Sequence, residues 1–171
     1  CVGQLCSTDH TPVGHRANPV RVFDHLKKRR RLLPAAATPS LGSHDVLVLV
    51  MAAGVNYNGV WAGLGIPISP FDVHKAAYHI AGSDASGIVW AVGEKVTRWR
   101  VGDEVVIHCN QDDGDDEECN GGDPMYSASQ RIWGYETPDG SFAQFTAVQS
   151  QQLMPRPKHL TWEESACYTL T

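Results

Sequence analysis

The 171-residue sequence has no long apolar run, because none of its hydrophobic stretches approaches the ~20 residues that a membrane-spanning helix needs. No signal peptide is visible either. The five cysteines are an odd number at irregular spacing, so they form no recognisable disulfide framework. These absences favour a cytoplasmic protein without a membrane partner. A hydrophobic content of 42% with 19% charged residues then fits a globular domain.

A dinucleotide-binding fingerprint is also missing, because no GxGxxG motif follows a predicted strand. The sequence therefore offers no recognisable dinucleotide-binding turn. The first residue is Cys1 rather than Met, which predicts that the chain is a piece of a longer protein.

Charge is divided unevenly along the chain. Residues 1–40 hold seven Lys/Arg and two Asp/Glu, a net charge of +5, whereas residues 41–171 hold seven and seventeen, a net charge of −10. The basic run Lys27–Arg31 has no interleaved aromatic residues and no recognisable nucleic-acid-binding motif beside it. We therefore expect no nucleic-acid partner, and we expect residues 1–40 to be an unassigned, poorly ordered segment.

From Leu41 onward, short apolar runs alternate with glycine turns. Residues 45–56 predict a strand that is buried on both faces, since apolar side chains occupy odd and even positions alike from 46 to 51. Thr161 and Glu164 have capping-box spacing and predict a helix start. Many short strands with one helix at the end favour a mainly β fold with short helices (α+β), arranged as a partly closed β barrel. Further strands are predicted at 88–92, 105–107 and 140–149, a short helical or looped segment at 56–70, and a long polar loop at 110–130.

The stretch Gly82–Gly93 reads GSDASGIVWAVG and resembles a motif of the medium-chain dehydrogenase/reductase superfamily. The zinc alcohol dehydrogenases of that superfamily have a zinc-binding His where Ser83 stands, and a Glu where Asp84 stands. A serine hydroxyl is a poor zinc ligand. The stretch is therefore similar to the zinc-free branch, with structural roles expected for Ser83 and Asp84.

Four stretches carry a closer resemblance: VMAAGVNYNGVW, YHIAGSDASGIV, RIWGYET and QLMPRPKHLTWEE. Together they resemble the crotonyl-CoA carboxylase/reductase family over residues 41–171, and no similarity is recognised in residues 1–40. The resemblance implies a GroES-like catalytic lobe, with a Rossmann cofactor domain beyond Thr171 and a homo-oligomer in the full-length enzyme. It also implies that NADPH and CO2 convert an enoyl-CoA (crotonyl-CoA to ethylmalonyl-CoA) without zinc.

The resemblance implies three site residues. Asn58 matches the amide that holds CO2, Glu136 the carboxylate that orders a water together with a His of the absent half, and Tyr135 the aromatic residue that shields the site. Many relatives have Phe at the position of Tyr135. From the residues alone, Asn58 is also compatible with a turn former, Tyr135 with a core residue and Glu136 with a solvated acid. Asn56 is expected to support the backbone.

No metal site is predicted. Only Cys109 and Cys119 follow the strand at 105–107, too few for a closed tetrahedral zinc site. The acidic stretch at 112–123 lacks the ligand spacing of a calcium loop and is expected to be solvated. Three histidines between residues 74 and 108 lack metal-ligand spacing and are expected to be core or surface residues. They are His74, His79 and His108.

Two alternative functions stay open on the sequence. One is a plain enoyl-thioester or quinone reductase of the same superfamily, which would not need Asn58 and Glu136 together. The other is a non-catalytic barrel module, either an interaction module or a truncated product without activity. The resemblance itself implies an enzyme only as the full-length protein, and this fragment alone is expected to be inactive.

Overall fold

The computed structural model describes residues 20–24, 29–33 and 39–170. In the first two ranges, strands β1 (Val20–Asp24) and β2 (Arg29–Leu33) pair antiparallel. No element is predicted from the sequence in residues 1–40, so the structure adds this pair. The remainder of that segment, with the expectation of poor order, lies outside the described residues.

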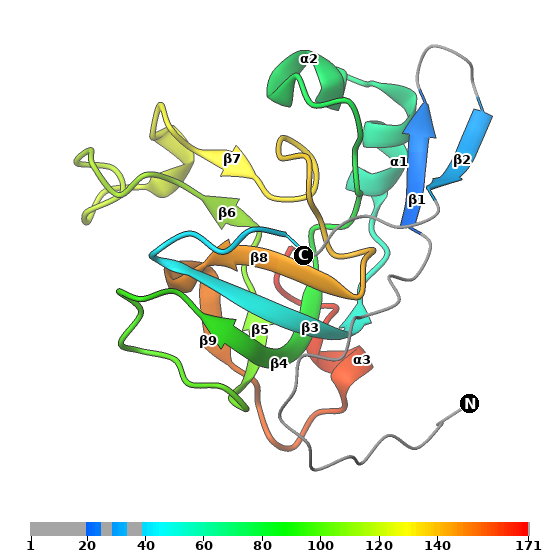
Figure 1. Cartoon of the computed structure of the whole chain (residues 1–171). Helices are drawn as coiled ribbons and strands as arrows, with labels where there is room; N and C mark the ends of the chain where they lie inside the picture. The colour runs from blue at the N-terminus through cyan, green and yellow to red at the C-terminus, as the bar shows by residue number, and fades with distance from the viewer. Residues whose placement is uncertain (1–19, 25–28, 34–38, 171) are drawn as a thin grey trace.

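A five-stranded antiparallel sheet forms the centre of the described chain (Figure 1). Its strand order is β8-β3-β4-β5-β9. The strands are β3 (Asp45–Ala53), β4 (Ala85–Val92), β5 (Glu104–Ile107), β8 (Phe145–Gln149) and β9 (Leu153–Pro155). The predicted mainly β class with short helices is therefore confirmed.

The two edge strands of this sheet are consecutive in the chain. β8 and β9 are joined only by the short 3-10 helix η2 (Ser150–Gln152), so the sheet must curl until its edges approach. Two backbone carbonyls of η2 hold the junction. The indole Nε1 of Trp99 donates to Ser150 O at 2.8 Å, and His108 N donates to Gln152 O at 2.8 Å. The result is an incompletely closed barrel, since β8 and β9 do not pair within the described residues.

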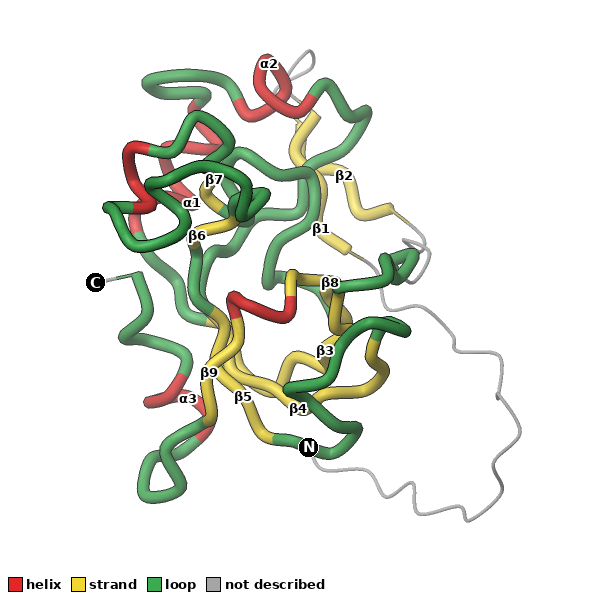
Figure 2. The backbone as a smooth tube through the Cα atoms, turned by 90° about the vertical axis from the view of Figure 1, so that its left-hand side faces the viewer, coloured by secondary structure: helices red, strands yellow, loops and turns green. Residues whose placement is uncertain are grey.

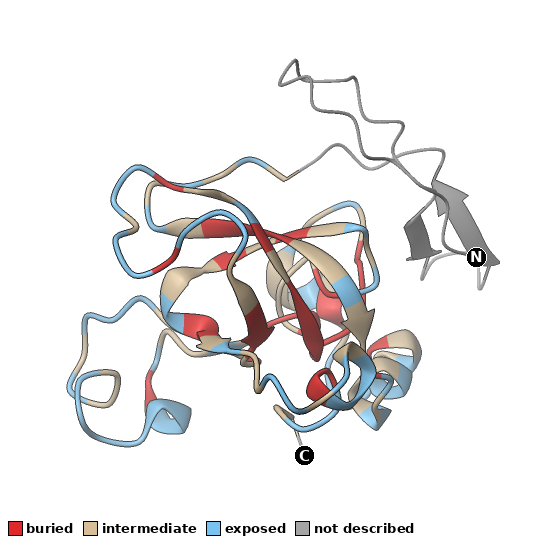
Figure 3. Cartoon of the chain, turned by 90° about the horizontal axis from the view of Figure 1, so that it is seen from below, coloured by how far each residue is buried: buried red, intermediate tan, exposed pale blue. Residues whose placement is uncertain are grey.

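The core comes mainly from the strands of the sheet, and Figure 3 shows several of the buried stretches on these strands. Its residues are Val46, Val48, Ala85, Val89, Trp99, Val105, Ile107, Trp133, Val148 and Leu153. The prediction that β3 is buried on both faces holds only for its first half. Met51 is 46% exposed, because the pairing of β3 with β8 ends at Leu49.

Short helices lie around the sheet. The helix predicted near residue 161 is confirmed, with reciprocal bonds between Thr161 and Glu164 at 3.2 and 2.8 Å. α2 was not predicted, and it starts with Pro70 at a position where a missing N–H costs nothing. None of the helices in the described part of the chain could span a membrane. The helices are α1 (Tyr57–Leu64), α2 (Pro70–His74), η1 (Pro124–Tyr126) and α3 (Trp162–Ser165).

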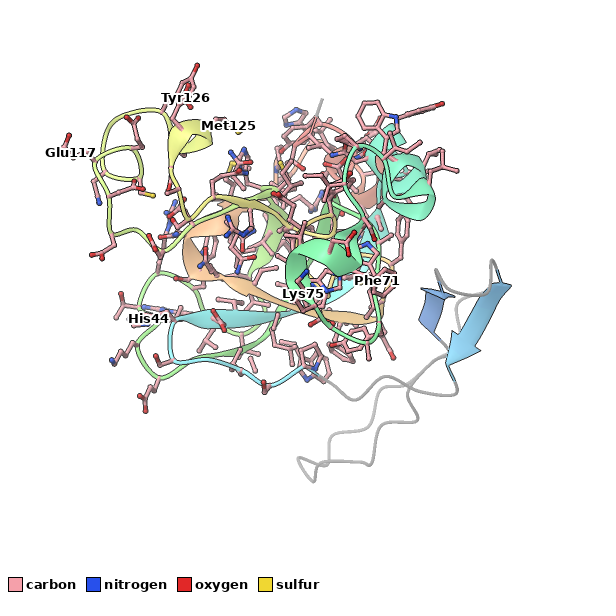
Figure 4. All side chains as sticks on the ribbon, turned by 90° about the horizontal axis from the view of Figure 1, so that it is seen from above. His44, Phe71, Lys75, Glu117, Met125 and Tyr126 are labelled. Carbon is pink, nitrogen blue, oxygen red and sulfur yellow. The ribbon has the colours of Figure 1, made fainter. Side chains whose placement is uncertain are left out.

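The segment predicted as a polar loop is an excursion closed by two short strands, β6 (Asn110–Gln111) and β7 (Arg131–Ile132), which pair antiparallel. Its acids bind the excursion's own groups. Asp116 accepts from Ser127 Oγ at 2.7 Å and from Cys119 N at 2.9 Å, and these bonds lower its pKa to about 2. Figure 4 shows Glu117, Met125 and Tyr126 on this excursion, well apart from α2.

Candidate functional site

Asn58 is the second residue of α1, and the chain around it explains why a helix begins there. Asn56 is the N-cap, and its Oδ1 accepts from Asn58 N at 2.9 Å. The helix ends where Gly65 adopts a left-handed conformation (φ 71°) that favours glycine. Asn58 is half-buried, and its side-chain amide has no hydrogen-bond partner among the described residues. Two donors and an acceptor are therefore free to meet a ligand.

The side chain of Asn56 is held in turn by the buried carboxylate of Asp84. Its Nδ2 donates to Asp84 Oδ2 at 2.7 Å, while Thr169 Oγ1 donates to Asp84 Oδ1 at 2.6 Å. Asp84 is 1% exposed, so its carboxylate accepts hydrogen bonds from protein groups and does not contact solvent. These contacts agree with the expectation that Asn56 supports the backbone and that Asp84 is structural.

Tyr135 is buried, and its hydroxyl faces the loop that follows α1. The hydroxyl lies 2.8 Å from Ile66 O and 3.2 Å from Ile68 O, so the proton is directed to backbone carbonyls on either side of Pro67. Burial raises the pKa of Tyr135, so the phenol stays neutral. The extra hydroxyl, relative to Phe, thus finds its partner within the protein and ties the loop to the turn that carries Glu136.

Glu136 closes a tight turn with Ile132. Its Oε2 accepts from Ile132 N at 2.8 Å, and its own N–H donates to Ile132 O at 2.7 Å. The carboxylate is therefore half-buried and oriented, unlike a freely solvated loop acid. Oε1 has no partner within the described residues, which leaves it able to accept from a water or a ligand.

One buried stretch, residues 80–84, supports both parts of the site. The segment after Glu136 is bonded to it: Ser141 N donates to Gly82 O at 2.8 Å, and Phe142 N donates to Ala81 O at 3.0 Å. Asp84 at the end of the same stretch holds Asn56. The structure thus attaches Asn58, Tyr135 and Glu136 to a common support, although no hydrogen bond joins Asn58 directly to Glu136 among the described residues. Figures 1 and 2 show α1 and α2 on one side of the sheet, with α3 apart from them.

The remaining polar residues nearby offer neither a nucleophile nor a metal cage. Burial raises the pKa of the Cys109 thiol to about 11, so it stays protonated and unreactive. Ser83 is buried in the turn before β4. Within the described ranges, no three His, Cys, Asp or Glu side chains are grouped to hold a metal ion. The side chains present can donate from an amide and accept at a carboxylate, which suits binding of a small polar molecule.

The His79 ring is buried beneath α2, as expected for a core histidine. It is 1% exposed and stacks on His74 with ring centroids 5.4 Å apart. Burial, and then the charge of His74, lower the pKa of His79 to about 4. His74 also has a lowered pKa, chiefly because of burial, with Asp139 acting in the opposite direction.

We expect the stability of the fold to fall below pH 6.5. The folded pKa of His79 lies below its ordinary value of 6.5, so the unfolded chain binds its proton first as the pH falls from about 6.5 to about 4. With ~1.4 kcal/mol per pKa unit, the free energy of unfolding should drop by up to about 3 kcal/mol over that window. Urea unfolding between pH 4 and 8 measures it. His79→Phe should remove most of the slope and the exposed control His159→Phe should not, whereas an equal slope in both variants would contradict the assignment.

Comparisons with known proteins identify relatives of this chain. The alcohol dehydrogenase GroES-like domain matches residues 42–158. The chain is 71% identical to a crotonyl-CoA carboxylase/reductase of Cereibacter sphaeroides over 99% of its own length and 40% of the relative's. It is 43% identical to a crotonyl-CoA reductase of Streptomyces collinus over 78% of the chain and 33% of the relative. A solved structure of the crotonyl-CoA carboxylase/reductase AntE in complex with NADP superposes with a TM-score of 0.79 at 39% identity, covering 94% of this chain and 42% of that one.

Two consequences follow from the coverage. The chain spans about 40% of the length of its Cereibacter sphaeroides relative, so that relative contains much that has no counterpart here. The alignment also includes nearly all of residues 1–40, where no similarity was recognised from the motifs; that limit on the resemblance was wrong.

Proposed function

Because the chain belongs to the family of proteins with an alcohol dehydrogenase GroES-like domain, we propose that it is the catalytic lobe of an NADPH-dependent enoyl-CoA carboxylase/reductase. Its substrate would be crotonyl-CoA and its product ethylmalonyl-CoA. The observation that carries the proposal is the free amide of Asn58, held at the start of α1 by a cap and a buried carboxylate.

Carboxylation requires a hydrogen-bond donor for CO2 in a site from which bulk water is excluded. Hydride added to the β-carbon of the enoyl thioester leaves an enolate, whose α-carbon forms a bond to CO2 and yields a carboxylate. A proton competes with CO2 for the same carbon. We assign to Asn58 a hydrogen bond to one oxygen of CO2, and to the free Glu136 Oε1 the ordering of a water beside it. Tyr135 keeps bulk water out, because its ring is buried and its hydroxyl is already bonded to protein.

Bound NADPH would supply the hydride. The described residues do not themselves fit a dinucleotide, since their sheet is antiparallel and the sequence has no glycine fingerprint after a strand. We therefore assign cofactor binding mainly to another domain of the protein. We also propose that the enzyme is zinc-free, because Ser83 offers no good zinc ligand. We propose further that the full-length enzyme is a homo-oligomer, as the family resemblance implies, and that it is cytoplasmic without membrane or nucleic-acid partners.

Plain reduction is the second candidate, favoured by the name of the Streptomyces collinus relative, a crotonyl-CoA reductase. Plain reduction would form the same enolate but would not require a residue that binds CO2. The two candidates differ only in whether carbon dioxide or a proton reaches the α-carbon.

A chimera tests the proposal. These 171 residues would replace the matched part of the Cereibacter sphaeroides protein, to which they are 71% identical. With crotonyl-CoA, NADPH, bicarbonate and carbonic anhydrase, we expect the carboxylated thioester as the main product. The unaltered Cereibacter sphaeroides protein is the positive control. Only saturated thioester would favour plain reduction, and a folded chimera without NADPH turnover would favour a non-catalytic module.

A further inference from the structure

Asp84 takes no part in the chemistry proposed above, although it is a buried acid. It lies where three segments meet: the end of β3, the start of β4 and the stretch after α3. Its two oxygens are divided between two of these segments, Oδ2 accepting from Asn56 Nδ2 at 2.7 Å and Oδ1 from Thr169 Oγ1 at 2.6 Å. A carboxylate that is 1% exposed and bonded on both sides is a fixed point of the structure.

The backbone beside Asp84 leaves it no room to shift. Gly54 N donates to Asp84 O at 3.2 Å. A Cβ added at Gly54 would approach Asp84 Cβ to 2.9 Å and Ala166 O to 2.6 Å, so glycine permits the close approach of β3 to this residue. The position of Asp84 is therefore set by packing as well as by hydrogen bonds.

The side-chain amide of Asn56 connects Asp84 to the start of α1. Nδ2 donates to the fixed carboxylate, and Oδ1 accepts from Asn58 N at 2.9 Å. The orientation of the cap, and with it the first turn of α1, is thus determined by Asp84. The Asn58 side chain has no hydrogen bond of its own within the described residues, so its placement depends on the backbone beneath it.

We propose that Asn56 and Asp84 are positioning residues that set the ratio of carboxylation to simple reduction by fixing the backbone of Asn58. This inference rests on the proposed function. Misplacing a reacting or binding group by about 1 Å can cost up to ~100-fold in rate.

The product ratio of the chimera is the first readout. Asn56→Ala removes the cap and the link, and Asn56→Ser keeps a cap acceptor but is too short to reach Asp84. We expect both to lower the carboxylated-to-reduced ratio about threefold or more, with NADPH oxidation retained. In an Asn58→Leu background neither should lower it further, because residues that act through one group are not additive. Ser86→Ala is the matched control, since it removes a buried 2.6 Å bond to Trp162 O in the same region.

Hydrogen exchange of the chain provides a second readout without turnover. The Asn58 N–H should exchange faster in Asn56→Ala, and the loss of ratio should accompany it. An Asn56→Ser variant with the normal ratio would overturn the role of Asp84. A reduced ratio in Ser86→Ala as well would make the effect a general loosening and overturn the inference. If the parent chimera forms no carboxylated product, the proposed function itself fails, and exchange at Asn58 still decides whether Asn56 holds the turn.

Discussion

Replacing Asn58 with Leu should shift the products of the chimera from the carboxylated to the saturated thioester by up to about tenfold. Leu keeps the approximate volume but removes both amide donors. One hydrogen bond to a neutral partner is worth ~0.5–1.5 kcal/mol, and ~1.4 kcal/mol is tenfold in a rate ratio. NADPH oxidation should persist, because Asn58 is assigned to CO2 and not to the nicotinamide or the thioester oxygen.

The measurement is the ratio of the two acyl-CoA products with saturating bicarbonate and carbonic anhydrase. Asn120→Leu is the matched control, since it makes the same change in the excursion between β6 and β7. An unchanged ratio in Asn58→Leu would mean that this residue does not hold the gas. Equal loss of both products would make it a residue that positions the substrate or maintains the fold.

Gly134→Ala should be among the most destabilising substitutions available in the lobe. Gly134 has φ +73°, which L side chains rarely adopt, and an added Cβ would collide with the backbone carbonyl of Gly82. The left-handed conformation costs roughly 1–2 kcal/mol and overpacking against backbone typically ~1–3 kcal/mol more. We therefore expect a loss of about 2–5 kcal/mol, together with displacement of Tyr135 and Glu136, which follow directly.

Gly114→Ala separates the two contributions. Gly114 has nearly the same conformation, φ +72°, but nothing lies within 4 Å of an added Cβ. Its loss should stay near ~1–2 kcal/mol, since only the backbone term remains. Urea unfolding of both variants measures the difference. Similar losses at the two glycines would contradict the close approach of the Gly134 turn to Gly82.

Local patterns in the sequence were sufficient for β3, β4, β5, β8 and the start of α3. The β-rich run at 45–56 predicted β3, which ends at Ala53, and the Thr161 and Glu164 spacing predicted the capping box of α3. Both patterns depend on neighbours in the chain. Motifs also predicted the GroES-like class, which the domain match confirms. The roles of Asn58, Tyr135 and Glu136 came from resemblance alone, and they stay proposals.

Tertiary structure decided what links these elements. No local pattern indicates that Asp84 bonds both Asn56 and Thr169, or that the Tyr135 hydroxyl reaches Ile66 O, because these partners lie far apart in the chain. The extent of two-sided burial along β3 likewise depended on where β8 stops pairing. A sequence by itself determines which residues prefer strands, caps and turns, since those preferences act over a few residues. Which polar groups share a buried contact is decided only when packing brings distant segments together and leaves them no water to bond with.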